Sequence, residues 1–294
     1  MKIPGATRLE IHRRLESTNQ RLLEWARDGA PFFAVVVARE QTRGRGRSGS
    51  HWVSAPDAGL WISVLLPPPP SGPPGVASMA VGVAAARAIE SVAGVEVGLK
   101  WPNDLLIPSS PDRPEPGKVG GVLCEVATRA GSPVIVAGIG INLRRPPNVE
   151  SGEAADQENG PGLENRAMGK DAHLLAGAAF LDEATGAPIG LERLAGTLVE
   201  ELRSVANPPP DQADESLLVA WHERDLLEGQ KVSCTAGGVG VARGVGRDGR
   251  LQMTDAQGRL RRIQGGTVRL LGEGPPALFG SGGGDKRSPE GIHL

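Results

Sequence analysis

The 294-residue chain lacks several features that mark specialised classes of protein. It has two cysteines, no tyrosine and four phenylalanines, and its 32 Lys and Arg nearly balance 34 Asp and Glu. Cys124 and Cys234 cannot form a disulfide framework, and no CxxC or Cys/His cluster offers a zinc site. The net charge is −2, whereas a dedicated nucleic-acid-binding protein typically has an excess of basic residues.

The sequence also has no segment that predicts a membrane helix or a secretion signal. Residues 58–86 carry no charge, but prolines at 67–70, 73 and 74 interrupt them. Each proline inside a helix costs ~3 kcal/mol, so this stretch predicts two apolar elements joined by a stiff loop. The N-terminus is charged too early for a signal peptide. We therefore expect a cytoplasmic protein that does not bind membranes.

What is present predicts an α+β fold with a smaller β region at the end. Uncharged or β-branched runs predict strands at 32–38, 60–66, 95–100, 105–107, 120–126 and 134–140, and longer periodic segments predict helices at 76–92, 170–184 and 191–205. After Trp221 the chain changes to short alternating runs over 230–271, separated by glycine pairs and Asp248–Gly249. Such runs are typical of tight hairpins in a small antiparallel barrel. Composition predicts a flexible insertion at 145–168 and a disordered tail at 273–294.

The most distinctive segment is residues 41–52, QTRGRGRSGSHW, which follows a predicted strand. Three arginines alternate with glycines, and this combination suits an anionic ligand. Glycine lets the backbone approach closely, and guanidinium groups bind phosphate or carboxylate. The segment is not a Walker A loop, because it lacks the terminal Gly-Lys-Ser/Thr. A solvated flexible loop or an RNA-binding segment remains an alternative.

Three further motifs follow, each with a plain structural alternative. KWPNDL at 100–105 places Asn103 and Asp104 after a stiff proline, although such residues also form ordinary turns. GKVGGVLCE at 117–125 places Lys118 before a glycine-rich strand, where a lysine can reach a ligand or simply face solvent. GIGIN at 138–142 has two glycines that permit close approach of a ligand or of a neighbouring strand.

Taken in this order, the four motifs resemble those of the biotin–protein ligases. The earlier segment ESTNQ at 16–20 resembles their biotin-contacting segment, and the likeness extends over residues 8–272. The resemblance implies a mixed β-sheet with flanking helices, similar to class II aminoacyl-tRNA synthetases, over residues 1–222. It also implies an SH3-like C-terminal barrel over residues 223–272.

The resemblance implies an activity as well. Members of the family use ATP, with Mg²⁺, to convert biotin into biotinoyl-adenylate, and then pass biotin to one lysine of a biotin carboxyl carrier domain in a carboxylase. The ESTNQ segment begins too early to leave room for a DNA-binding helix-turn-helix, so no DNA partner is expected. The resemblance leaves both a monomer and a homodimer open.

The resemblance assigns roles to individual residues. Lys118, Arg47 and Asp104 are the expected catalytic residues, with Asp104 handling Mg²⁺ or the substrate lysine; no protein ligand set for a metal is otherwise expected. The expected ligand-binding residues are Ser17, Thr18, Asn19, Gln41, Gly44, Arg45, Gly46, Arg47, Trp52, Asn103, Lys118, Gly120, Gly138, Asn142 and Trp221. Ser17 or Thr18 also suits a helix N-cap, and Trp221 suits either an adenine contact or an interdomain core.

Two alternatives belong to different functional classes. A lipoate or octanoate transferase shares the broad fold implied by the resemblance, although the arginine loop and KWPNDL favour biotin. An RNA-binding module would use the arginines as contacts and the barrel as a platform. The net charge of −2 and the shortage of aromatic residues argue against that module.

Overall fold

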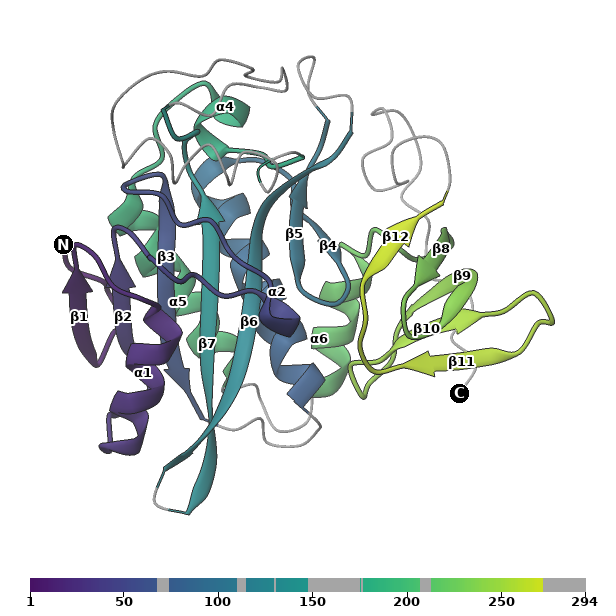
Figure 1. Cartoon of the computed structure of the whole chain (residues 1–294), viewed down its shortest axis with the longest axis horizontal. Helices are drawn as coiled ribbons and strands as arrows, with labels where there is room; N and C mark the ends of the chain where they lie inside the picture. Colours follow the sequence, from purple (N-terminus) through teal and green to yellow (C-terminus); the bar gives the residue numbers. More distant parts are fainter. Residues whose placement is uncertain are drawn as a thin grey trace, which may run out of the picture.

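The computed structural model describes residues 1–67, 74–109, 115–129, 131–147, 175, 177–206 and 213–271. The larger part is built on a seven-stranded mixed sheet in the order β1-β2-β3-β7-β6-β5-β4 (Figure 1). Its strands are β1 (Arg8–His12), β2 (Ala34–Ala38), β3 (Gly59–Leu66), β4 (Gly98–Lys100), β5 (Asp104–Ile107), β6 (Gly117–Arg129) and β7 (Ser132–Asn142). Strands β1 and β2 run parallel, and the other neighbours are antiparallel.

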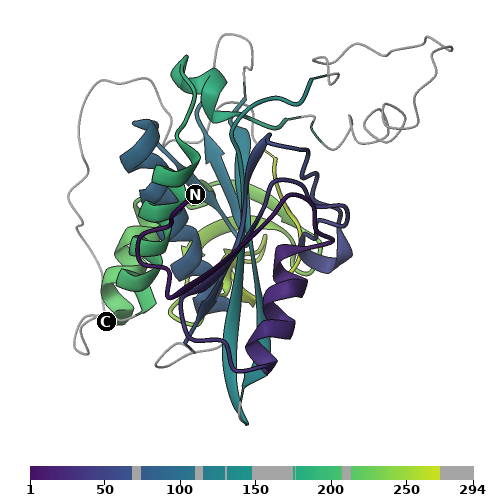
Figure 2. The ribbon, with the colours of Figure 1, turned by 90° about the vertical axis from the view of Figure 1, so that its left-hand side faces the viewer.

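Helices cover both faces of this sheet. Helix α1 (Thr18–Arg27) lies on one face, while α2 (Pro74–Ala93) and α5 (Leu191–Ala206) lie on the other (Figure 2). Leu22 and Ala26 of α1 pack against Val36 and Val136 of the sheet. Because both faces are covered, β2 and β3 are buried along their whole lengths, which explains their uninterrupted apolar sequences.

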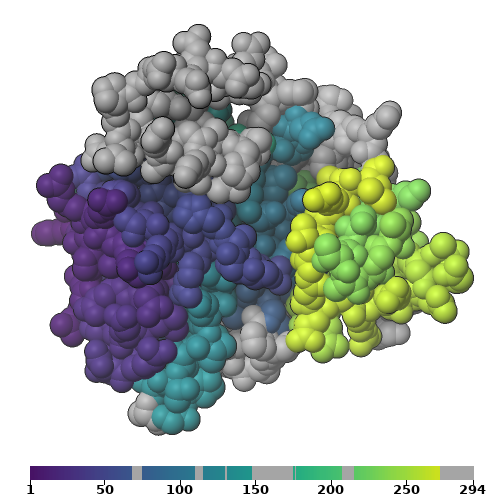
Figure 3. Space-filling model, in the orientation of Figure 1, coloured from purple at the N-terminus to yellow at the C-terminus, as the bar shows by residue number. Residues whose placement is uncertain are grey.

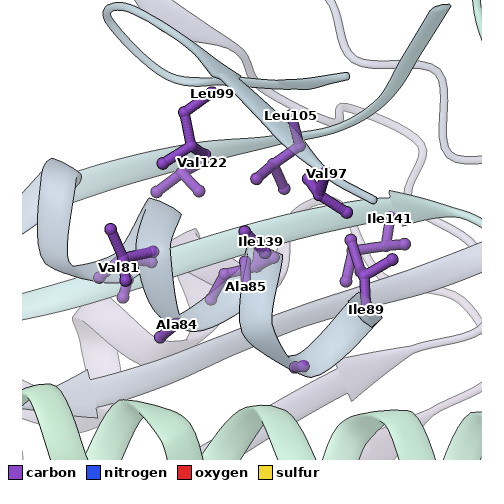
Figure 4. Packing of buried hydrophobic residues seen from close by; sticks show 14 of the residues in the cluster. Val81, Ala84, Ala85, Ile89, Val97, Leu99, Leu105, Val122, Ile139 and Ile141 are labelled. Carbon is purple, nitrogen blue, oxygen red and sulfur yellow. The ribbon is translucent and has the colours of Figure 1, made fainter. Parts of the chain in front are cut away.

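The core between α2 and the sheet depends on small residues in the helix. The small side chains of Ala84 and Ala85 let α2 lie close to the sheet. Ile89 of the same helix belongs to one buried cluster with Ile139 and Ile141 of β7 (Figure 4). By length and composition α2 could also span a membrane over Gly75–Ala93, but 61% of that stretch is buried inside the protein. Its apolar sequence is therefore explained by packing in the core.

The C-terminal part is a second, five-stranded antiparallel sheet in the order β11-β10-β9-β8-β12. It contains β8 (Lys231–Cys234), β9 (Gly238–Val245), β10 (Leu251–Thr254), β11 (Leu260–Ile263) and β12 (Val268–Leu270) and stands beside the larger body (Figure 3). Within residues 213–271, no pairing joins the edge strands β11 and β12. The hairpins predicted from the sequence are confirmed, whereas closure into a barrel is not observed.

The main elements match the sequence predictions, with one clear error. The predicted helix at 170–184 is wrong over residues 177–180, and its described helical part is only α4 (Leu181–Thr185). Backbone pairing explains the error, because Lys118 N–H donates to Gly177 O and Ala179 N–H donates to Lys118 O. The sequence analysis also missed β1 and α6 (Ala213–His222). Most of the predicted insertion at 145–168 and the whole predicted tail lie outside the described residues.

Candidate functional site

A cavity of about 560 Å³ lies where the seven-stranded sheet meets the C-terminal sheet. This volume falls within the usual range for small-molecule sites. Its lining includes Ser17, Thr18, Asn19, Gln41, Arg45, Gly46, Arg47, Trp52, Lys100, Asn103, Asp104, Lys118, Gly121, Gly138, Gly140 and Thr267. All five motifs singled out in the sequence contribute at least two residues each, including Lys118 and Gly121 from GKVGGVLCE. The structure therefore gathers segments that are far apart in the chain around one space.

One wall of the cavity is the beginning of α1. Ser17 is the N-cap of this helix, and its Oγ accepts a hydrogen bond from Gln20 N. The backbone N–H of Thr18 donates to Gln41 Oε1 at 2.8 Å, and Gln41 Nε2 donates to Ser54 Oγ at 2.8 Å. The capping role and the position on the cavity thus occur together, and the hydrogen bonds fix the orientation of the Gln41 carboxamide.

Asn19 is held by partners that the sequence analysis did not identify. Its Nδ2 donates to Leu123 O at 3.1 Å and to Glu125 Oε2 at 2.8 Å, while its Oδ1 accepts from Ser63 Oγ at 2.6 Å. Ser63 is fully buried in the otherwise apolar β3. A single buried hydroxyl in an apolar strand needs a polar partner, and this was the available sequence signal for Ser63.

The arginine loop also lines the cavity. Arg43 pairs with Glu16 at 3.5 Å, and Arg45 pairs with Glu125 at 2.9 Å. Arg47 begins the short 3₁₀ turn η1 (Arg47–Gly49) and has no ion pair among the residues that the structure describes. Burial lowers the pKa of Arg47, and the nearby Asp104 carboxylate partly opposes that effect. Arg47 is therefore a partly desolvated cation that faces the cavity.

Lys118 and Asp104 meet at the same cavity. Lys118 Nζ lies 2.5 Å from Asp104 Oδ1 and 5.1 Å from the centre of the Trp52 ring. Lys100 lines the same region, and burial lowers its pKa. Since Asp104 also acts electrostatically on Arg47 and Lys100, one carboxylate serves three cations. The cavity has an excess of positive charge that suits an anionic ligand.

Glycines in β6 and β7 line part of the cavity. A Cβ on Gly138 would overlap the Asn19 carboxamide, and a Cβ on Gly140 would overlap the Trp52 indole. The indole therefore lies directly against the backbone of β7. Its Nε1 is buried and has no hydrogen-bond partner in the described structure. This N–H group next to the cavity can therefore donate a hydrogen bond to an acceptor on a ligand.

The structure places four predicted site residues away from the cavity lining. Gly44 packs against the Trp52 backbone, Gly120 packs against Gly140 O and Leu105, and Asn142 Nδ2 donates to Lys118 O at 3.3 Å. Trp221 is 1% exposed, and its Nε1 donates to Asp225 Oδ2 at 3.3 Å. These residues pack against neighbouring parts of the fold. The sequence suggested either an adenine contact or a core position for Trp221, and its side chain lies in the core.

Several residues around the cavity were absent from the set assigned in the sequence, including Lys100, Gly121, Gly140, Ser63 and Glu125. Lys100, Gly121 and Gly140 lie within motifs that the sequence analysis had identified, and each lines the cavity. Ser63 and Glu125 lie behind the wall and hold Asn19. The last two act through other side chains, and a sequence pattern alone does not reveal such contacts.

The arrangement is suited to joining two anions. Arg47, Lys118 and Lys100 supply positive charge around the cavity, and the α1 wall supplies neutral hydrogen-bonding groups. No cysteine is among the described residues that line the cavity, and most of the charged side chains there are cations. The site therefore favours charge stabilisation and positioning over covalent catalysis by the protein.

Comparison with known proteins points to one family. Residues 11–142 match the model of the biotin/lipoate A/B protein ligase family. The biotin--[acetyl-CoA-carboxylase] ligase of Mycobacterium tuberculosis is 30% identical over an alignment of 280 residues that covers 90% of this chain and 89% of that protein. The bifunctional ligase/repressor BirA of Bacillus subtilis is 37% identical over 143 residues, but that match spans only 42% of its length.

The fold is also similar to that of a solved structure. The biotin protein ligase from Aquifex aeolicus, solved in complex with biotin and ATP, aligns with a TM-score of 0.65 at 24% identity. The alignment covers 90% of this chain and 99% of that one. It therefore includes both the seven-stranded sheet and the C-terminal sheet.

Proposed function

The chain belongs to the biotin–protein ligases of the biotin/lipoate A/B protein ligase family, and we propose that it attaches biotin to a lysine of a biotin carboxyl carrier domain. In the first step, the biotin carboxylate attacks the α-phosphorus of ATP, which forms biotinoyl-adenylate and releases pyrophosphate. In the second step, the lysine amine attacks the acyl carbon, forms an amide and releases AMP.

The observation that supports this proposal most strongly is the convergence of Arg47 and Lys118 on one cavity. Adenylation brings a carboxylate to a phosphate, and the transition state carries further negative charge on phosphate oxygens. Cations that are already positioned offset this repulsion without having to reorganise. Lys118 is held by Asp104 at 2.5 Å, so its amine is fixed before the ligand arrives.

The α1 wall suits the other end of biotin. A ureido ring has two N–H donors and one carbonyl acceptor, and hydroxyl and carboxamide groups bind such a ring well. Ser17, Thr18 and Gln41 are aligned along this wall by their mutual hydrogen bonds and by the helix cap. In this arrangement the ureido ring lies near α1 and the carboxylate extends toward Lys118.

The arginine loop protects the reactive acyl phosphate from water. Residues 45–52 line the cavity continuously, and Arg45 pairs with Glu125 on β6. Exclusion of water prevents hydrolysis of an activated acid and strengthens the charge interactions inside the site. The loop therefore retains the adenylate until a carrier lysine reaches it.

The proposed cofactor set is completed by Mg²⁺ with ATP. Magnesium prefers oxygen ligands and commonly binds through one or two carboxylates together with substrate phosphates. Asp104 is the one carboxylate among the described residues lining the cavity, and its chemistry fits this role. Asp104 would hold Mg²⁺, which would supply positive charge toward the phosphates of ATP.

The proposal extends to the organisation of the whole chain. Residues 1–222 act as the catalytic domain, and residues 223–272 act as an SH3-like module that completes the cavity through Thr235 and Thr267. The protein works in the cytoplasm, where biotin-dependent carboxylases offer the acceptor lysine. It acts as a monomer or a homodimer.

A labelling experiment with the purified protein tests the function. The protein is incubated with ATP, Mg²⁺ and a carrier domain, and radiolabelled biotin or octanoate is supplied in parallel. We expect transfer of biotin to the carrier and no transfer of octanoate. Transfer of octanoate in place of biotin would instead support the lipoate or octanoate class, and label on neither would contradict the proposal.

A further inference from the structure

Glu125 of β6 accepts hydrogen bonds from two separate walls of the cavity. Its Oε2 lies 2.8 Å from Asn19 Nδ2 at the start of α1 and 2.9 Å from Arg45 Nη2 in the arginine loop. Glu125 itself does not line the cavity. The carboxylate thus lies behind the site and joins the wall beside the ureido position to the loop beside the phosphate position.

The three loop arginines differ in how they are paired. Arg43 and Glu16 form an exposed pair at the outer end of the loop, and their side chains are 76% and 62% exposed. The Arg45–Glu125 pair is more enclosed, with side chains 39% and 25% exposed. Arg47 alone lines the cavity without an ion pair among the described residues. Glu125 therefore neutralises the charge of Arg45, whereas the charge of Arg47 remains available to a ligand.

Because Arg45 lies close to Arg47 in the loop, its pairing with Glu125 also affects the position of Arg47. Arg45 stands two residues before Arg47, where the short turn η1 begins, and it forms an isolated bridge with His51 at the other arm of the loop. Fixing Arg45 therefore fixes the base of the turn that carries Arg47. An enclosed, charge-assisted hydrogen bond holds such a base more firmly than an exposed pair does.

We propose that Glu125 is a positioning residue that ties the arginine loop to the start of α1 and keeps Arg47 over the cavity. The inference rests on the proposed function for the identity of the ligand, biotinoyl-adenylate. Glu125 touches no reacting atom in this account. It acts through Arg45 and Asn19, and its loss loosens retention of the intermediate more than it slows the chemical step.

Limited trypsin digestion tests the tether without any ligand, because the loop contains arginines. We expect Glu125→Gln to speed cleavage after Arg45 and Arg47 about tenfold. The matched control is Glu16→Gln, which breaks the exposed Arg43–Glu16 pair and should change cleavage less than about twofold. Equal cleavage of Glu125→Gln and wild type, or a general loss of folding shown by a lower Tm, would overturn the inference.

A second measurement tests the effect on the reaction. We expect Glu125→Gln to release preformed biotinoyl-adenylate about tenfold faster and to raise the KM for biotin, while kcat changes less than about twofold. Glu125→Asp should restore part of the retention. The double variant Glu125→Gln/Arg45→Gln should release the adenylate no faster than the more severe single variant, because both changes break the same contact.

The two measurements separate this inference from the proposed function. Additive effects of the two substitutions on adenylate release, or a fall in kcat without a change in KM, would contradict a positioning role for Glu125. If the wild-type protein forms no biotinoyl-adenylate, the proposed function fails. The trypsin digestion still decides in that case whether Glu125 holds the loop.

Discussion

Lys118 Nζ lies 2.5 Å from Asp104 Oδ1, although the two residues are 14 positions apart in the chain. Antiparallel pairing of β5 with β6 brings them together, because Asp104 pairs with Gly121 and Leu106 pairs with Lys118. The pair holds a cation at the cavity while neutralising it in the absence of ligand. An entering phosphate or carboxylate can then take over part of this interaction.

The first prediction concerns Lys118. Lys118→Ala should reduce the rate of adenylate formation by about 10²–10³, the usual loss when one positioned donor to a developing negative charge is removed. Biotin-dependent release of pyrophosphate measures this step directly. Lys118→Arg keeps the charge and should recover part of the rate. A near-normal rate for Lys118→Ala would remove this residue from the reacting site.

The second prediction concerns Arg47. Arg47→Ala removes the unpaired guanidinium over the cavity and should speed release of biotinoyl-adenylate by about tenfold or more. Arg43→Ala is the control, because Arg43 belongs to the same loop but pairs with Glu16 on the surface. Rates of adenylate release measured by stopped flow should differ between the two variants. Equal rates would show that loop charge as a whole matters, and would contradict a special role for Arg47.

The third prediction concerns Trp52, one of five tryptophans. Its buried Nε1 has no partner among the described residues, and Lys118 lies over its ring. Binding of biotin and ATP should therefore change tryptophan fluorescence, and Trp52→Phe should remove most of that change. Trp61→Phe is the control, because Trp61 Nε1 already donates to Ala55 O. A full ligand-dependent change in Trp52→Phe would contradict the placement of Trp52 at the ligand.

The fourth prediction concerns a pair between α6 and the segment that leads into the C-terminal sheet. The hydrogen bond that the protonated His222 donates to Glu228, over 3.0 Å, raises the pKa of His222 above its usual 6.5, and the same contact lowers the pKa of Glu228. The stabilisation is thus complete below pH 6.5 and fades as the pH rises through the raised pKa of His222. It also fades as the pH falls below 4.5, where Glu228 becomes protonated.

Urea unfolding of wild type and His222→Gln at pH 6 and pH 9 measures this effect. We expect wild type to be more stable by ~0.5–1 kcal/mol at pH 6, because the His222 side chain is 37% exposed and solvent screens the pair. The difference should largely vanish at pH 9. Asp225 also faces the pair, and burial raises its pKa to about 6, but it is present in both proteins. An equal difference at both pH values would show that His222 stabilises by packing alone.

The sequence predicted those parts of the fold that are set by local pattern. The strands β2 and β3 followed from uncharged, β-branched runs, and α5 followed from Leu194, Leu198 and Leu202, which are all buried on one face. The short β1 was missed because its charged residues mask the alternation. Residues 177–180 were misassigned because their backbone pairs with Lys118, a contact that no local pattern reveals.

The candidate site divides in the same way. Motif positions such as Arg47 and Lys118, which line the cavity, were singled out in the sequence because their residue types and spacing suit an anionic ligand. Gly120 was assigned to the ligand but packs against Gly140 O, since only the register of β6 and β7 decides which glycine faces the cavity. Glu125 was missed as a site residue because its importance lies in two partners, Asn19 and Arg45, that are distant in sequence.

Mass spectrometry after incubation with biotin, ATP, Mg²⁺ and a carrier domain tests the central claim most directly. The wild-type protein should retain biotinoyl-adenylate when the carrier is withheld, and should add one biotin to the carrier lysine when it is supplied. Lys118→Ala, shown to be folded by its Tm, should do neither at a comparable rate. An unmodified carrier and no adenylate with the folded wild-type protein would contradict the account.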